Sequence, residues 1–284
     1  MESNYAAFLL GHKMRPLKVR VADDRYPDEN EIVIRVRVIA INQIDWKIQD
    51  TPWKMFKYPI IMGTDVAGEV VDVGSEVTRF KIGDRVLGHA VSFATEDERH
   101  AAMQNYSILM SNMESPIPKS LSIEQAVVPP LGATASRKSF DYVKQLGAAE
   151  VLDYRSLNKK EELLKLFRTR ELAGAFDAIG VEDTFNSTTE IVAQASGRRF
   201  VASTGDLEDV EVPEGVEWKG VFAINIRDNE VGAMIYEEFL PEALKTGKYI
   251  IAPEPLIIGK GLSSVQAGID ASKSPSGKKV VVSI

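Results

Sequence analysis

Residues 59–88 read PIIMGTDVAGEVVDVGSEVTRFKIGDRVLG, and this stretch decides the fold of the first half of the chain. Glycines at positions 63, 68, 74 and 83 divide it into short runs rich in β-branched residues, a pattern typical of small strands closed by tight turns. Just upstream, EIVIRVRVIAINQIDWK (31–47) begins with alternating apolar and polar residues, which predicts a strand with one buried face. That face is expected to carry Ile32, Ile34, Val36 and Val38, with Arg35 and Arg37 opposite.

The composition is that of an ordinary globular protein. With 284 residues, 44% of them hydrophobic and 26% charged, the chain is long enough for two domains. Its net charge of −7 argues against nucleic acid as a partner, because binding to a phosphate backbone needs a basic surface. No apolar run is long enough to span a membrane or to act as a secretory signal. These properties predict a soluble, cytoplasmic protein that acts on small molecules.

The chain contains no cysteine and only three histidines, His12, His89 and His100. Disulfides, a thiolate nucleophile and a four-cysteine zinc site are therefore excluded. His89 follows directly on the run VLG, and we interpret it as a residue at a strand end or turn rather than as a metal ligand. The sequence predicts no metal site.

The chain is expected to form two domains, one of them discontinuous. Residues 1–125 show short alternating runs between turn signals, and residues 250–284 are expected to return to this domain. Residues 126–249 alternate helices and strands, which predicts a parallel, doubly wound sheet. At the transition, Ser122 is expected to cap a helix, with Gln125 three residues on. Further helices are expected at 139–147, 157–174, 184–196 and 263–272, and further strands at 150–153, 176–180, 198–205, 249–258 and 278–284.

Several phrases of the sequence resemble one family of enzymes. INQIDWK (41–47) and MGTDVAGEV (62–70) resemble the GroES-like catalytic domain of the medium-chain dehydrogenase/reductases, in a version without zinc. SFDYVKQLGA (139–148), LGAAEVLDY (146–154) and VFAINI (221–226) resemble the Rossmann half of that family. The nearest resemblance is to fungal zinc-independent reductases, including trans-acting enoyl reductases of polyketide pathways. It implies an α/β fold, with a GroES-like β-domain and a truncated Rossmann-type doubly wound parallel sheet.

The sequence departs from the family at two places. Zinc-containing members carry Gly-His-Glu where this chain has Gly63-Thr64-Asp65, and their catalytic zinc takes cysteine and histidine ligands, so the resemblance implies a mechanism without metal. PPLGATAS (129–136) runs directly into RKSFDYVK (137–144), where the family has roughly 60 more residues, about two βαβ units. We therefore expect an internal deletion that removes the glycine-rich turn for the cofactor pyrophosphate. Gly259-Lys260-Gly261 is interpreted as a turn and not as a replacement for it.

The candidate catalytic segment is Asp45, Trp46, Lys47 and Ile48. By resemblance these residues contact the nicotinamide cofactor, and Lys47 is the candidate catalytic residue. A carboxylate, an indole and an ammonium group within one turn can orient a polar ring and donate a proton. The alternative is that Asp45 and Lys47 cap the following helix while Trp46 packs in the core.

Other ligand contacts are expected by resemblance in the second half of the chain. Ser136, Arg137, Lys138 and Ser139 stand where the family places its ribose-phosphate loop. Arginine and lysine there favour the 2′-phosphate of NADPH, and a solvated basic turn is the alternative. Tyr154 matches a tyrosine near the adenosine, and Pro275 and Ser276 precede the last strand. Val221, Phe222, Ala223, Ile224 and Asn225 resemble the apolar lining of the substrate cavity, or equally a buried strand.

Two functions of different classes follow from the sequence. The first is a zinc-independent, NADPH-dependent reductase of a polyketide-type enoyl or enone substrate in secondary metabolism, with carbonyl or quinone reduction as a near alternative. Its expected partners are a small-molecule or carrier-bound acyl substrate and a polyketide synthase. The second is a non-catalytic remnant or scaffold protein that lost its pyrophosphate loop, or a truncated gene model of an active enzyme. The sequence leaves the oligomeric state open.

Overall fold

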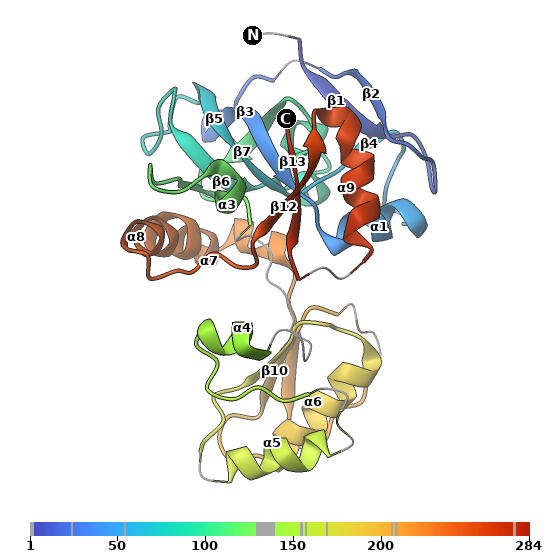
Figure 1. The fold of residues 1–284 in the computed structure, drawn as a ribbon, viewed down its shortest axis with the longest axis vertical. Coiled ribbons are helices and arrows are strands. Elements are labelled where there is room, and N and C mark those ends of the chain that lie inside the picture. Colours follow the sequence, from blue (N-terminus) through green and yellow to red (C-terminus); the bar gives the residue numbers. More distant parts are fainter. Residues whose placement is uncertain are drawn as a thin grey trace. The chain divides into compact units, whose positions relative to one another are not determined.

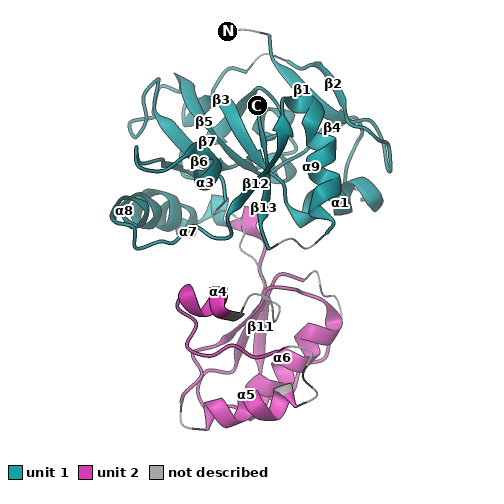
Figure 2. Cartoon of the chain, in the orientation of Figure 1, with its two compact units in different colours: residues 1–132, 226–284 teal, residues 133–225 magenta. Residues whose placement is uncertain are grey.

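The computed structural model describes residues 3–23, 25–53, 55–128, 140–153, 156, 158–168, 170–205, 207, 210–274 and 277–284. The chain folds into two compact units, teal and magenta in Figure 2: residues 1–132 with 226–284, and residues 133–225. The sequence-based division differs at residues 126–132 and 226–249, which group with the first unit. The reason is packing, because Tyr236 and Leu240 are buried in the same apolar cluster as Val281 of the first unit.

The first unit contains two β-sheets (Figure 1). Their strands are β1 (Tyr5–Leu9), β2 (Lys18–Val21), β3 (Glu31–Ala40), β4 (Ile60–Ile61), β5 (Asp65–Val73), β6 (Arg85–His89), β7 (Tyr106–Met110), β8 (Glu114–Pro116), β12 (Pro255–Lys260) and β13 (Lys279–Ser283). The larger, seven-stranded sheet has the order β12-β13-β3-β5-β6-β8, with β7 paired to β3, and the smaller has the order β2-β1-β4. In the larger sheet, β12 and β13 are parallel and the other pairs are antiparallel.

The alternating apolar side chains of strand β3 do not all pack in the same apolar cluster. Its first half follows the predicted alternation, because Ile32, Ile34 and Val36 lie in one apolar cluster. The pairing with β5 shifts register between Val36 and Val38, which marks a β-bulge. Val38 therefore packs in a different cluster, and the prediction that it shares a face with Ile32 is wrong. Beyond the bulge, Ile39 rejoins the first cluster.

Short helices complete the first unit. Two expectations are confirmed: Ser122 caps α3 (Ile123–Ala126) in a capping box, and a helical segment covers 263–272. The predicted strand at 249–258 forms only from Pro255 onward, as β12. Other helices of this unit are α1 (Gln43–Asp50), α2 (Ser92–Thr95), η1 (Glu98–His100), α7 (Glu230–Ala233), η4 (Met234–Phe239), α8 (Leu240–Thr246), η5 (Leu262–Ser264) and α9 (Val265–Ser272), and η3 (Ala223–Asp228) crosses the boundary between the units.

The second unit is a small parallel sheet with helices. Its strands, β9 (Ala175–Asp177), β10 (Phe200–Ser203) and β11 (Glu217–Gly220), pair in the order β11-β10-β9, and both pairings are parallel, as predicted. Helix α6 (Glu182–Gln194) packs on β9 and β10, and α5 (Lys159–Phe167) packs on α6. Helix α4 (Phe140–Gln145) ends before Gly147, whose φ of 104° favours glycine, so the predicted stop is confirmed.

The predicted strand at 150–153 is wrong. These residues are irregular in conformation, and none of the described strands pairs with them. A strand needs a neighbour for its backbone N–H and C=O groups, so the short apolar run Val151–Leu152 does not make one by itself.

Phe185→Ala is expected to destabilise the second unit selectively. Phe185 on α6 is fully buried and meets Trp218 of β11 edge to face, with ring centroids 4.9 Å apart. Truncation of a buried phenylalanine leaves a cavity and costs about 3–5 kcal/mol. As a control, Phe176→Ala removes a ring that is 62% exposed and should change stability by less than about 0.5 kcal/mol. Urea unfolding followed by tryptophan fluorescence measures both, and equal losses would contradict this core assignment.

Candidate functional site

Four strand ends of the seven-stranded sheet meet at one edge and bring polar side chains together. Ala40 at the end of β3 pairs with Asp65 at the start of β5, and Asp65 pairs in turn with His89 at the end of β6. Because β13 runs antiparallel to β3, its first residue, Lys279, lies at the same edge. Asn42 follows shortly after the end of β3. The fold thus brings together side chains that are far apart in sequence.

Asn42, Thr64, Asp65 and Lys279 form a closed ring of hydrogen bonds, which we call the polar ring. The Lys279 ammonium group donates to Asp65 Oδ2 at 3.2 Å and to Asn42 Oδ1. Asn42 Nδ2 donates to Thr64 Oγ1 at 3.0 Å, and the Thr64 hydroxyl donates to Asp65 Oδ1 at 3.2 Å. All four residues are buried. Charged side chains are seldom buried unless they are paired, and the ring provides that pairing.

Asp65 is ionised in the polar ring. Burial raises its pKa, but the Lys279 ammonium group and the His89 imidazole outweigh burial, so that the pKa lies below its usual value. His89 Nδ1 lies 3.4 Å from Asp65 Oδ1. The other nitrogen of His89, Nε2, is buried and has no hydrogen-bond partner among the described residues. His89 ends a strand, as predicted, but its contact with Asp65 is not apparent from the sequence.

Asp45 lies in the first turn of helix α1, in a fully buried position. Its Oδ2 accepts the backbone N–H of Asn42 at 2.7 Å, which confirms the capping alternative for this residue. Burial raises the pKa of Asp45 to about 7; the Asn42 hydrogen bond and Lys279 oppose this rise, and the Asp65 carboxylate adds to it. Oδ1 of Asp45 has no partner among the described residues. An acid that titrates near neutral pH thus lies beside one that is fully ionised.

Within the candidate catalytic segment, Lys47 has the most exposed side chain. Asp45 and Ile48 are buried, whereas Lys47 is exposed on α1. Trp46 is half-buried, packs against the main apolar cluster and donates from Nε1 to Gln43 Oε1 at 2.6 Å. Lys47 and the exposed part of Trp46 are therefore the groups of this segment that a ligand can reach.

The segment predicted to line the substrate cavity does not form a buried strand. β11 ends at Gly220, and the next residues, Val221 and Phe222, are 39% and 42% exposed. Residues 223–225 begin the 3₁₀ helix η3. The strand alternative is therefore wrong, and the segment leaves apolar surface on the second unit. Other predicted contacts lie outside the described residues: Ser136, Arg137, Lys138, Ser139, Tyr154, Pro275 and Ser276.

A polar cluster at the carboxyl ends of the parallel strands is not among the residues predicted from sequence. Asp177, the last residue of β9, accepts hydrogen bonds from the backbone N–H groups of Ile179 and Gly180, at 3.1 and 3.2 Å, and from the Thr184 hydroxyl. Gly180 has a φ of 68°, and a Cβ there would lie 2.2 Å from the backbone nitrogen of Gly205, in the loop after β10. The signal that could have found this site is the aspartate that ends β9, in FDAIG, and the glycine two residues after β10, in ASTG.

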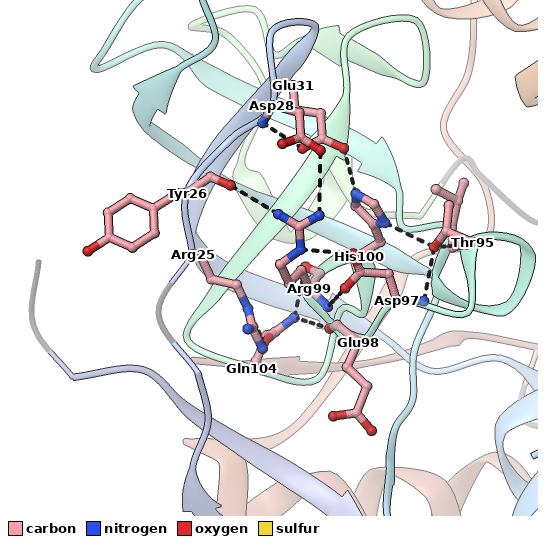
Figure 3. Close-up of polar contacts among 11 residues, drawn as sticks. Arg25, Tyr26, Asp28, Glu31, Thr95, Asp97, Glu98, Arg99, His100 and Gln104 are labelled. Carbon is pink, nitrogen blue, oxygen red and sulfur yellow. Dashed lines mark hydrogen bonds and ion pairs between the residues drawn. The ribbon is translucent and has the colours of Figure 1, made fainter. Parts of the chain in front are cut away.

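A second polar cluster surrounds η1 in the first unit (Figure 3). His100 Nε2 lies 2.7 Å from Glu31 Oε1, and His100 Nδ1 lies 2.9 Å from the Thr95 hydroxyl. Arg99 Nε donates to Asp97 Oδ2 at 2.8 Å. Among the described residues, no group of three or more histidine, aspartate or glutamate side chains is placed to hold a metal ion. We interpret this cluster as support for the loop before β7.

Comparisons with known proteins agree with this architecture. Residues 28–119 match the alcohol dehydrogenase GroES-like domain. The chain is 42% identical over 312 residues to the zinc-binding alcohol dehydrogenase domain-containing protein cipB of Emericella nidulans, covering 99% of this chain and 98% of cipB. It is 31% identical over 342 residues to the trans-enoyl reductase himH of Aspergillus japonicus, covering 99% and 97%. The Escherichia coli quinone oxidoreductase complexed with NADPH superposes with a TM-score of 0.72 at 16% identity, covering 99% of this chain and all of that one.

The chain belongs to the medium-chain dehydrogenase/reductase family, and it is an oxidoreductase of that family. The predicted fold class, a GroES-like β-domain with a Rossmann-type parallel sheet, is confirmed. In the part of the chain that the structure describes, no helix is both long and apolar enough to cross a bilayer.

Asp45→Asn is expected to remove a pH dependence of stability. Asp45 titrates near pH 7 when folded and near 3.8 when unfolded, so between these values the folded chain binds one more proton. Stability therefore falls as the pH rises through this window, by about 4 kcal/mol from this group. Asparagine keeps an oxygen for the Asn42 N–H but does not titrate. Urea unfolding on both sides of the window measures the effect, and an equal fall in wild type and variant would contradict it.

Proposed function

We propose that this protein is a zinc-independent, NADPH-dependent enoyl reductase of secondary metabolism. The reaction adds a hydride to the β-carbon of an enoyl thioester or enone and a proton to the α-carbon, the proton coming from Lys47 or from water. The observation that carries the proposal is the exposed Lys47 on α1, a helix whose start is held by the buried polar ring of a GroES-like domain. The similarity to the trans-enoyl reductase himH supports the substrate class.

The chemistry of the polar ring supports zinc independence, because its residues do not fit a zinc ion. Zinc in proteins is bound by thiolates, imidazoles and carboxylates. The one carboxylate of the ring, Asp65, is already paired with the Lys279 ammonium group and faces His89. The other members are the Thr64 hydroxyl and the Asn42 amide. A dication placed here would be repelled by Lys279, and the proposed mechanism has no step that uses a metal.

The proposed binding place for part of the dinucleotide in the second unit is the carboxyl end of its parallel strands. Ligands of open α/β sheets bind at the carboxyl ends of the strands, where Asp177, Gly180 and Gly205 lie in two closely packed loops. NADPH, when bound, supplies the hydride. Arg137 and Lys138 would pair with its 2′-phosphate and so select it over NADH. The NADPH complex of the similarly folded E. coli quinone oxidoreductase supports this choice.

The proposed substrate is a small-molecule or carrier-bound acyl group. The exposed apolar surface of Val221 and Phe222 suits an acyl chain, because burial of such surface against hydrocarbon is favourable. A polyketide synthase is the proposed source of a carrier-bound substrate, and the cytoplasm is the proposed location.

A non-catalytic remnant is the second candidate, and one observation favours it. The alignments with cipB and himH extend over 312 and 342 residues, more than the 284 residues of this chain, so these relatives carry residues that it lacks. We propose that the missing residues include the pyrophosphate turn expected between positions 129 and 144. Without that turn, a dinucleotide loses the backbone N–H donors at a helix N-terminus. A truncated gene model of an active enzyme would have the same sequence.

Thermal unfolding with each nucleotide separates the two candidates. At about 100 times its Kd, a ligand stabilises the native state by about 2.7 kcal/mol, which raises Tm by several degrees in a chain of this size. We expect a rise with NADPH and a smaller one or none with NADH at the same concentration. A folded sample whose Tm moves with neither nucleotide would support the remnant.

Lys47→Met is expected to lower turnover by about 10²–10⁴-fold, because the proton donor is lost. Tm should change little, because Lys47 is exposed. Lys119→Met, at another exposed lysine of the same unit, is the matched control and should keep wild-type turnover. NADPH consumption with the crotonyl thioester of N-acetylcysteamine measures both variants. Unchanged turnover in Lys47→Met would assign the proton to water.

A further inference from the structure

The member of the polar ring most distant in sequence from α1 is Lys279. We propose that Lys279 is a positioning residue, whose buried ammonium group fixes the start of α1 through Asn42 and Asp65, and with it the direction of Lys47. The catalytic consequence rests on the proposed function of Lys47. The fixing of α1 rests on the geometry of the ring alone.

Lys279 is the counter-ion of a carboxylate that water does not reach. Asp65 is 0% exposed and Lys279 is 8% exposed. Lys279 donates to Asp65 Oδ2, while Thr64 and His89 face Oδ1. Removal of one member of a buried ion pair leaves the other charge uncompensated, which is strongly destabilising. Lys279 therefore makes the largest favourable contribution to the charge on Asp65, with His89 second.

Asn42 connects the charge of Lys279 to the helix. It precedes α1, and three of its polar groups are bound at once: Oδ1 by Lys279, Nδ2 to Thr64, and the backbone N–H to Asp45. The residue before a helix determines how the chain enters its first turn. Because Asn42 is held from three sides, α1 leaves β3 in one defined direction.

Helix α9 holds α1 along its side. Gln43 Nε2 donates to the backbone oxygen of Ser272 at 2.6 Å, and Gln49 Nε2 donates to Gln266 Oε1 at 2.9 Å. Both partners belong to α9, the helix that precedes β13. The polar ring therefore holds the start of α1 and α9 holds its length, with the exposed Lys47 between these contacts.

Four variants test this assignment. They are Lys279→Met, Lys279→Arg, the neutral double variant Asp65→Asn/Lys279→Met, and Lys260→Met as the control for loss of an exposed lysine. The measurements are Tm, hydrogen–deuterium exchange of the α1 backbone amides by mass spectrometry, and kcat and KM with NADPH and the crotonyl thioester of N-acetylcysteamine.

Lys279→Met is expected to lower Tm by several degrees and to speed amide exchange most in α1. Its kcat should fall by about tenfold or more while KM stays within about twofold, because a misplaced group affects the chemical step more than binding. The neutral double variant should regain Tm, since no buried charge is left alone, but neither kcat nor slow exchange in α1. Lys279→Arg should partly restore Tm, slow exchange in α1 and kcat. Lys260→Met should match wild type in all three measurements.

Recovery of Tm, slow exchange and kcat together in the neutral double variant would overturn the proposal, because Lys279 would then be a counter-ion only. A rise in exchange spread evenly over the first unit of Lys279→Met, and not greatest in α1, would also overturn it. The exchange data decide the question even for a chain without turnover. In that case the proposed function fails, whereas fast amide exchange in α1 of Lys279→Met still supports the positioning role of Lys279.

Discussion

The buried ion pair of Lys279 and Asp65 is the constraint on which the rest of the first unit depends. A carboxylate with no exposed surface is tolerated only with a fixed cation beside it, and here that cation comes from β13. Strand β13 lies next to β3, and β3 lies next to β5, so this strand order is the one that brings Lys279 to Asp65 and Asn42. The apolar clusters on the two faces of the sheet then exclude water from the pair.

The ammonium group of Lys279 at this strand end differs from a metal ion in its chemical consequences. An ammonium group is a compact charge with three N–H donors and needs no thiolate ligand, which suits a chain without cysteine. Unlike a metal with an open coordination position, it cannot act as a Lewis acid on a substrate oxygen. The proposed reduction of a carbon–carbon double bond, with a proton from Lys47 or water, agrees with that difference.

Local features of this fold could be predicted from the sequence, whereas features set by distant partners could not. The capping box at Ser122 and the helix stop at Gly147 depend on a few adjacent residues. The bulge in β3 was not predictable, because one inserted residue leaves an alternating pattern on either side of it. The polar ring joins positions 237 residues apart, and its sequence signals are the missing cysteines and the change to Thr64-Asp65. Neither signal indicates that Lys279 is the partner of Asp65 and Asn42.

The position of β13 also has a consequence for the order of events on the ribosome. β13 lies between β12 and β3 in the sheet, although it comes after every other described strand in the chain. Synthesis proceeds from the N-terminus, so Asp65 emerges long before its counter-ion does. Until β13 emerges, the end of β3 from Val38 to Ala40 lacks a partner on the edge opposite β5, and an unpaired edge is a template for wrong strand pairing. A nascent chain interrupted before this point would therefore be a natural target for chaperones and for proteolytic quality control.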